Sequence, residues 1–229
     1  MNVFIIGGSS DIGISLSKYL KKRGYNVIIS YNRHACEIDD VYCVHMDVCN
    51  EKEVKSVFKD IFLKYGKIDV LIDMAAIYMD NDFLSKSKSE FMNVLEVNLV
   101  GMFLCNREYF KYMDNGTIIN ISSSDGIDTN NQYNIDYSAS KAGVINLSRS
   151  ISMVNTNKVI CICPNWIDSN STNMTSNEYL KFELNRTHQT RLITLDEFNS
   201  VVYDAICNYD NGDVLRIDVR DGELWIERI

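Results

Sequence analysis

The stretch Asn2-Val3-Phe4-Ile5-Ile6-Gly7-Gly8-Ser9-Ser10-Asp11-Ile12-Gly13 decides the fold of this 229-residue chain. Its apolar first part predicts a buried strand, and its glycine-rich part predicts a tight turn. Apolar residues then recur at helical spacing up to Gly24, and residues 27–30 predict a second strand. In such a unit the glycines let backbone approach a pyrophosphate, and the helix N-terminus offers it unpaired N–H groups. The stretch therefore favours nucleotide binding over a purely structural turn.

The same alternation continues along the chain. Further strands are predicted at residues 42–48, 69–74, 117–121, 159–163 and 214–218, with helices at 51–65, 90–113, 136–154 and 195–208. This order predicts an α/β fold: one doubly wound parallel sheet of about seven strands, with helices on both faces. Because no linker divides residues 1–229, we expect a single domain. Residues 169–190 are polar and weakly periodic, and we expect an irregular substrate loop or lid there.

The composition limits the classes of function. A net charge of -8 argues against nucleic-acid binding, which normally needs a basic face. No apolar run approaches membrane-spanning length and no basic leader precedes the first strand, so we expect a cytoplasmic protein without a membrane partner. The seven cysteines, Cys36 among them, include no Cys-x-x-Cys pair, and the three histidines lack metal-ligand spacing. We therefore expect neither disulfide bonds nor a metal site.

Tyr137 and Lys141 lie four positions apart on a predicted helix. Side chains at this spacing share one face of the helix, about one turn apart. A free phenol has a pKa near ~10, and a neighbouring ammonium lowers that pKa because it favours the phenolate. The pair can therefore make a general acid or base from a tyrosine. Taken alone, the spacing is a weak signal, because two solvated surface side chains explain it more often.

Several separated motifs, in order along the chain, resemble those of the short-chain dehydrogenases/reductases. They are the glycine turn Gly7 to Gly13, Asn98-Leu99-Val100-Gly101, Ile119-Asn120-Ile121-Ser122-Ser123, the Tyr137 to Lys141 signature, and Pro164-Asn165-Trp166-Ile167. The resemblance covers essentially the whole chain. It implies a Rossmann-type fold and similarity to 3-oxoacyl thioester reductases and related ketone reductases.

The resemblance also implies residue roles. Tyr137 would protonate a ketone as hydride arrives, and Lys141 would lower the tyrosine pKa and bind the nicotinamide ribose. Ser123 would hold the substrate oxygen, with Ser122 and Ser124 as neighbouring alternatives, and Asn98 would position a water in a proton relay. The implied cofactor-binding positions are Gly7, Ser9, Ser10, Ile12, Gly13, Asn32, Arg33, Asp47, Val48, Ala75, Pro164, Trp166 and Ile167.

The end of the second predicted strand bears on the choice of cofactor. In this family an acidic residue there accepts from the ribose 2′-hydroxyl of NAD, whereas a cation suits a 2′-phosphate. No acid occupies this strand end, and Arg33 follows it. The sequence therefore favours NADP(H) over NAD(H), although Arg33 is also compatible with an ordinary surface charge.

The chain departs from the family pattern at several positions. Asp11 stands where the middle glycine is usual, and we expect its carboxylate to cap the following helix. Asp73-Met74-Ala75-Ala76 replaces Asn-Asn-Ala-Gly after the fourth strand, which affects support of the central strands and the backbone approach to the cofactor. Asn165 replaces the glycine after Pro164. Asparagine can take the place of glycine there if the backbone at this position is left-handed. The four catalytic positions are all retained.

These observations favour an NADP(H)-dependent oxidoreductase that interconverts a ketone and a secondary alcohol of a small molecule. The competing hypothesis is a non-catalytic dinucleotide-binding sensor or regulator, which the altered segment at Asp73 would suit. In the lid, Tyr179, Phe182 and Leu184 are candidate substrate contacts. Family members commonly form homodimers or homotetramers through the Tyr/Lys helix and the helix before it, so we expect a homo-oligomer.

Overall fold

Eight strands form one sheet in the part of the chain that the computed structural model describes, residues 1–35, 37–129 and 131–229. Their order across the sheet is β3-β2-β1-β4-β5-β6-β7-β8, and only β7 and β8 pair antiparallel. The strands are β1 (Asn2–Ile6), β2 (Asn26–Tyr31), β3 (Tyr42–His45), β4 (Val70–Asp73), β5 (Thr117–Ile121), β6 (Lys158–Pro164), β7 (Val214–Arg220) and β8 (Glu223–Arg228). The expected doubly wound α/β fold is confirmed, with one strand more than predicted.

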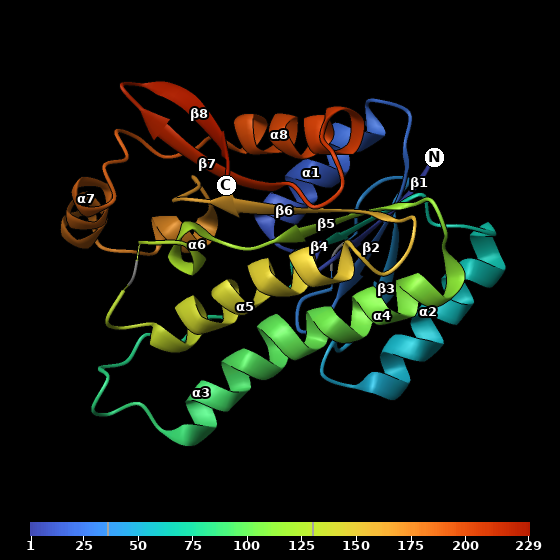
Figure 1. The fold of residues 1–229 in the computed structure, drawn as a ribbon, viewed down its shortest axis with the longest axis horizontal. Helices are drawn as coiled ribbons and strands as arrows, with labels where there is room; N and C mark the ends of the chain where they lie inside the picture. Colours follow the sequence, from blue (N-terminus) through green and yellow to red (C-terminus); the bar gives the residue numbers. More distant parts are fainter. Residues whose placement is uncertain (36, 130) are drawn as a thin grey trace.

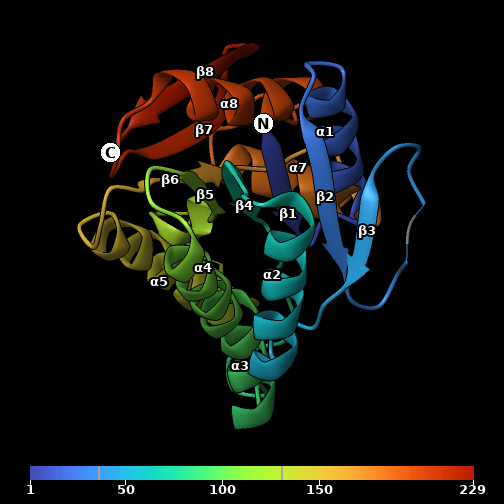
Figure 2. The ribbon, with the colours of Figure 1, turned by 90° about the vertical axis from the view of Figure 1, so that its right-hand side faces the viewer.

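Helices cover both faces of this sheet (Figures 1 and 2). One face carries α1 (Asp11–Lys21) and α8 (Leu195–Asn208), and the other carries α2 (Glu51–Tyr65), α4 (Met102–Tyr112) and α5 (Ile135–Ile151). The strands between them are apolar on both sides because both faces must be covered. In β1, Ile5 packs in the cluster below α1, whereas the Phe4 ring meets Phe58 of α2 at 5.4 Å.

The long helix expected at residues 90–113 is instead three successive helical segments. A capping box at Ser87 and Glu90 begins α3 (Lys88–Leu95), which continues into a π-helical turn (Glu96–Gly101) and then into α4. A π-turn adds a residue to the helix and is often found at functional sites. The turn contains Asn98, one of the predicted catalytic residues, and the sequence period alone does not reveal it.

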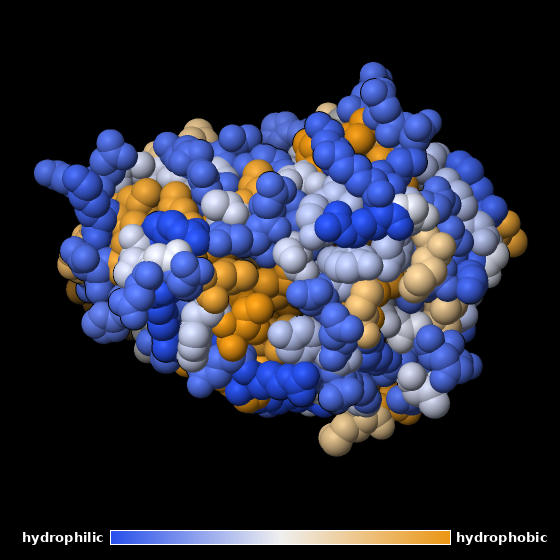
Figure 3. Space-filling view, turned by 90° about the horizontal axis from the view of Figure 1, so that it is seen from above, coloured by the Kyte–Doolittle hydropathy of each residue, from blue (hydrophilic) through white to orange (hydrophobic). Residues whose placement is uncertain are grey.

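The chain end beyond β7 forms an eighth strand that was not predicted. A tight turn at Asp221 and Gly222, both with positive φ, joins β7 to β8. Leu224 packs against the main core, and the Arg220 guanidinium lies 3.4 Å from the Trp225 ring centroid. Pairing with β7 covers the apolar residues of this strand only in part, since Ile226 stays exposed. Viewed from above, the molecule's surface is mainly hydrophilic with a restricted hydrophobic area (Figure 3).

Residues 169–190 are more ordered than the polar composition predicts. They contain a short helix, α6 (Asn170–Asn173), and a longer one, α7 (Asn177–Arg186). Ser176 begins α7 by accepting a hydrogen bond from the Tyr179 N–H, a standard N-cap contact. The expectation of an irregular segment is therefore wrong, because capping and an ion pair between Glu183 and Arg186 support a helix with little apolar periodicity.

The fold brings the predicted site residues to one edge of the sheet. The chain passes from β1 to β2 on one side and returns to β4 on the other, so the strand order reverses next to β1. In open α/β sheets, ligands bind at the carboxyl ends of the strands beside such a reversal.

In the described residues no helix is long and apolar enough to cross a membrane. Six cysteines there are free thiols, and Cys36 lies outside the described residues.

Candidate active site at the carboxyl edge of the sheet

Helix α5 presents Tyr137 and Lys141 toward the end of β5. The Lys141 ammonium is buried and donates a hydrogen bond to the Ile121 carbonyl at 2.8 Å. It lies 5.4 Å from the centroid of the half-buried Tyr137 ring. A Cβ on Gly126 would lie 2.6 Å from the Lys141 carbonyl carbon, so the turn after β5 is pressed directly against the helix. Because the Lys141 ammonium lies this close to the Tyr137 ring, the two side chains share one face of α5.

The three serines after β5 have different surroundings. Ser122 is buried and donates to the Lys141 carbonyl at 2.8 Å, and the buried Ser124 accepts from the Thr129 hydroxyl at 2.9 Å. Ser123 is less buried; its hydroxyl caps the short turn at Asp125 and hydrogen-bonds the side chain of Tyr137. Of the three, Ser123 is the one that lies against the tyrosine hydroxyl.

Asn98 joins the segment after β4 to the catalytic helix. Its amide oxygen accepts from the Ile77 N–H at 2.8 Å, and its amide nitrogen donates to the Ile77 carbonyl at 2.9 Å. The same nitrogen donates to the Ser140 hydroxyl at 3.1 Å, next to Lys141 in sequence. The residue is fully buried. The π-turn thus places Asn98 where it fixes the position of α5 relative to the end of β4.

Burial dominates the electrostatics of the Tyr137–Lys141 pair. Burial raises the pKa of Tyr137 above its ordinary value, and the nearby Asp125 carboxylate adds to this effect. Burial also lowers the pKa of Lys141 to about 8. We expected the ammonium to lower the tyrosine pKa; the pKa is raised instead, because desolvation of the phenolate dominates. Tyr137 is therefore protonated at neutral pH.

The glycine turn between β1 and α1 is shaped for close backbone approach. Gly7 has a φ of +73°, and a Cβ there would lie 2.8 Å from the Ala75 Cα. A Cβ on Gly13 would lie 2.6 Å from the Gly8 Cα. The Ser10 hydroxyl, rather than the expected Asp11 carboxylate, caps α1 by accepting from the Gly13 N–H at 3.1 Å. This cradle of bare backbone at a helix N-terminus fits a pyrophosphate.

Asp73 ends β4 inside the protein, beside the cradle. It is fully buried, and one carboxylate oxygen accepts a long bond of 3.4 Å from the Ala75 N–H. The other oxygen has no hydrogen-bond partner among the described residues. Burial raises the pKa of Asp73 to about 7, although the field of Lys141 acts in the opposite direction. Asp73, which departs from the family pattern, is thus a buried ionisable group whose pKa is influenced by the charge of Lys141.

The residues expected around the adenosine end lie beyond β2 and β3. Asn32 and Arg33 follow β2 and are exposed. β3 ends at His45, earlier than expected, so Asp47 and Val48 occupy the following turn. Asp47 accepts from the Cys49 N–H at 3.0 Å. Val48 is buried against Gly101 of the π-turn, where a Cβ would lie 2.7 Å from the Val48 Cγ2.

The segment after β6 holds the other predicted cofactor contacts. Pro164 ends β6, and Ile167 forms a bridge with Ile193. The Trp166 N–H donates to the side chain of Gln189 at 3.0 Å. Asn165 does not adopt the left-handed backbone that a glycine replacement suggested; its amide instead donates to Asp218 at 3.2 Å. Ser9 lies in the glycine turn, and Ile12, at the start of α1, packs against the hydrophobic core.

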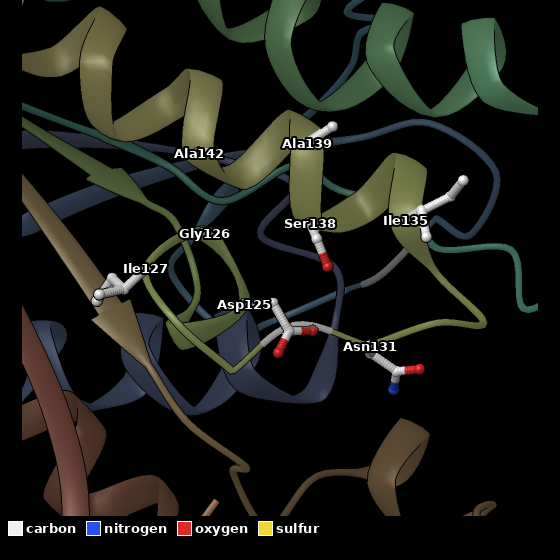
Figure 4. A pocket seen from close by; sticks show the side chains of 8 residues that line it. All are labelled: Asp125, Gly126, Ile127, Asn131, Ile135, Ser138, Ala139 and Ala142. Carbon is white, nitrogen blue, oxygen red and sulfur yellow. The ribbon is translucent and has the colours of Figure 1, made fainter.

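A cavity next to the Tyr137–Lys141 pair is lined by side chains that the sequence did not single out, and none of the four predicted catalytic residues is on its wall (Figure 4). It has a volume of about 350 Å³ and lies between α5 and the segment after β5, with Asp125, Asn131 and Ser138 on its wall. The Asn131 amide donates to the Tyr179 hydroxyl of α7 at 2.8 Å, and Arg186 donates to the Thr129 carbonyl at 3.1 Å. These contacts link α7 to the segment between β5 and α5. They join residues about 50 positions apart, and no local sequence pattern indicates them.

Comparisons with known proteins agree with this geometry. The family model for short chain dehydrogenase matches residues 1–180. A 3-oxoacyl-(acyl-carrier-protein) reductase FabG of Staphylococcus aureus is 29% identical over 194 residues, covering 77% of this chain and 78% of that protein. The Staphylococcus epidermidis FabG is 28% identical, with coverage of 77% and 79%.

Solved structures share the fold at lower identity. The ligand-free aldohexose dehydrogenase of Thermoplasma acidophilum superposes with a TM-score of 0.84 at 23% identity, covering 94% of this chain and 91% of that one. An actinorhodin polyketide ketoreductase variant with NADPH gives a TM-score of 0.84 at 19% identity, with 97% of both chains covered. Together with the family match, these likenesses identify the chain as a member of the short-chain dehydrogenase family, the oxidoreductases that bind nicotinamide dinucleotides.

Proposed function

We propose that this protein is an NADP(H)-dependent reductase that converts a ketone to a secondary alcohol and can run in reverse. The convergence of Tyr137, Ser123, Lys141 and Asn98 beside the glycine cradle carries this proposal. All four are held by buried helices and strand ends, and such rigid placement suits a catalytic group. The family membership and the FabG relatives support the same reaction class.

The proposed mechanism assigns one task to each side chain. When bound, the nicotinamide supplies the hydride. The Tyr137 hydroxyl donates its proton to the substrate carbonyl oxygen, while Ser123 donates a hydrogen bond to that oxygen and keeps it within reach. Lys141, anchored on the Ile121 carbonyl, supplies positive charge next to the phenolate that remains. Asn98 keeps the segment at Ile77 and helix α5 in register, and would hold the water of a proton relay.

The protonation state of Tyr137 favours the reductive direction at neutral pH. A tyrosine whose pKa is raised by burial carries its proton and is ready to act as an acid. The reverse reaction needs the phenolate, so alcohol oxidation should accelerate with rising pH. Ketone reduction should stay level until the pH approaches the tyrosine pKa.

The cofactor proposal rests on the β2 end. Arg33 is exposed there, with the adjacent Asn32 available as a hydrogen-bonding group. A guanidinium can bind a 2′-phosphate through two parallel N–H groups, which favours NADP(H). The fold likeness to an NADPH-bound ketoreductase supports this choice.

Two further proposals concern the substrate lid and the oligomeric assembly. Residues 169–190 are proposed as the substrate lid, with the partly buried Tyr179 and Leu184 and the exposed Phe182 on helix α7. Phe103 and Met153 are exposed on α4 and just after α5, and supply an apolar face for a homodimer or homotetramer. By contrast, Ile145 is buried in the core of the protomer.

The test combines cofactor titration with turnover. NADPH and NADH are titrated by fluorescence, and NADPH oxidation is then followed with a 3-oxoacyl thioester, a keto sugar and a cyclic ketone. We expect tighter binding of NADPH and turnover of at least one ketone, with the reverse rate rising between about pH 7 and 10. Binding without turnover of any carbonyl would favour the sensor hypothesis, which the buried Asp73 carboxylate suits. Binding of neither cofactor would contradict both.

A further inference from the structure

Asp11 joins two parts of the chain that are distant in sequence. Its carboxylate accepts a hydrogen bond of 2.6 Å from the backbone N–H of Asn170, 159 positions away. Asp11 is the first residue of α1, and Asn170 is the first residue of α6. The family usually has a glycine at position 11, which has no side chain to make such a contact. The carboxylate therefore adds a link between the glycine turn and the start of the lid.

The link meets a need of the lid itself. The first N–H groups of a helix have no partner within the helix. In α6 the Ser169 hydroxyl accepts from the Thr172 N–H, which leaves the Asn170 N–H to be satisfied from outside. A carboxylate is the strongest acceptor available for this purpose, because the bond is charge-assisted. Asp11 thus acts as an external cap for α6.

The hydrogen bond between Asp11 and Asn170 anchors the first turn of the lid to α1, and other contacts fix the neighbouring parts of the chain. The far end of the lid is fixed separately, where Gln189 exchanges two hydrogen bonds with the backbone of Trp166. Helix α1 is fixed to α8 by a hydrogen bond of 2.9 Å from the Asn199 amide to the Ser15 hydroxyl. Between them lies an open cavity of about 500 Å³, lined by both helices and by the lid. Asp11 spans one side of it.

We propose that Asp11 is a positioning residue that holds residues 168–175 against the glycine turn and thereby slows the release of bound cofactor. The cofactor part of this proposal rests on the proposed function; the holding of the lid does not. The hydrogen bond turns the carboxylate toward Asn170, and a backbone N–H partner offsets its charge at the helix end where a pyrophosphate would bind. Held in this way, the first turn of the lid stays next to the start of α1.

The test measures hydrogen exchange in the protein without cofactor. In Asp11→Gly, the amide of Asn170 loses its acceptor, and we expect its exchange, followed in a peptide covering residues 168–175, to accelerate about tenfold. Asp11→Asn keeps an amide oxygen in place, so we expect a smaller increase, about threefold. Asp196→Asn is the matched control, because Asp196 lines the same cavity from the first turn of α8. Exchange of the peptide covering residues 168–175 in this variant should equal that in the parent protein.

The second measurement is the NADPH dissociation rate in the same variants, which we expect to rise about tenfold in Asp11→Gly. Unchanged exchange at residues 168–175 in both Asp11 variants would overturn the proposal. Faster exchange with an unchanged dissociation rate would overturn its cofactor part. If the parent protein binds no dinucleotide, the proposed function fails, while the exchange data still decide whether Asp11 holds the lid.

Discussion

The carboxyl ends of β4 and β5 lie side by side in the sheet but satisfy their polar groups differently. At the β5 end, Asn120 bonds Asn106 and Ser148, and Ser122 bonds the backbone of α5. At the β4 end, Asp73 is equally buried but has one oxygen without a partner in the described chain. A buried polar group without a partner costs free energy, and a charged one costs more. The β5 end, where the proposed catalytic residues lie, is thus better supported than the β4 end beside the proposed cofactor site, which carries an unfavourable group.

The largest expected effect tests the supported end. Tyr137→Phe removes the proton donor and one hydroxyl, and kcat for ketone reduction should fall by about 10²–10⁴-fold. NADPH binding should be unchanged, because the phenyl ring is retained. Tyr133→Phe is the matched control: Tyr133 is exposed just before the same helix, and its loss should leave kcat unaltered. Substantial activity in Tyr137→Phe would move the acid to another group.

The next prediction tests the unsupported end through its pH dependence. The pKa of Asp73 is raised to about 7 in the folded protein, whereas an unfolded aspartate titrates near ~4. Between these values the folded state holds a proton that the unfolded state releases, so the contribution of Asp73 to stability falls as pH rises and is lowest above pH 7. Asp73→Asn should therefore stabilise the protein by about 2–4 kcal/mol at pH 8 and by little near pH 4.

Urea unfolding of the parent and variant at the two pH values measures this difference. The control is Asp69→Asn, just before the same strand, where the carboxylate accepts from the Asn2 N–H and pairs with Lys67. These contacts lower the pKa of Asp69 despite partial burial, so its loss should destabilise the protein at pH 8, the opposite sign. Equal effects of Asp73→Asn at both pH values would show that the buried carboxyl does not titrate in this range.

The smallest expected effect concerns Arg33, at the adenosine end of the proposed cofactor site. Arg33→Ala should weaken NADPH binding by about tenfold, because one charge-assisted contact to the 2′-phosphate is lost at an exposed position. NADH binding should not change. Lys59→Ala removes an equally exposed cation on α2 and should affect neither cofactor. A fluorescence titration that shows equal losses for NADPH and NADH would assign Arg33 to general attraction rather than recognition of the phosphate.

Periodic patterns predicted the parts of the fold that depend on local sequence. The strand, glycine turn and helix at residues 2–24 follow from spacing alone, and α2, β5 and α8 have the expected bounds. The π-turn was missed because the helical segments before and after it were interpreted as one continuous helix, although an added residue shifts the phase of the apolar pattern between them. Strand β8 was not predicted, although Asp221-Gly222 is a strong hairpin signal.

The site was predictable only where its residues belong to motifs. Tyr137, Lys141 and Ser123 lie on α5 and at the end of β5, and Asn98 donates to Ser140 of the same helix; their catalytic roles, and the choice of Ser123 over its neighbours, stay predictions. The direction of the Tyr137 pKa could not be predicted, because it depends on burial and on Asp125. The hydrogen bond between Asp11 and Asn170 could not be predicted from the sequence either, because it joins residues 159 positions apart.

The π-turn at residues 96–101 also sets the phase between two helices. Each residue of an α-helix advances the chain by about 100°, so one added residue rotates the helix before the turn by that angle relative to the helix after it. Helix α3 therefore meets its neighbours with a different side than a regular helix continuing from α4 would offer. Deletion of a single residue here would make the helix more regular and would turn Ser87 and Glu90 away from their present places. The irregular turn is thus the feature that allows one continuous helical run to serve two separate contact surfaces.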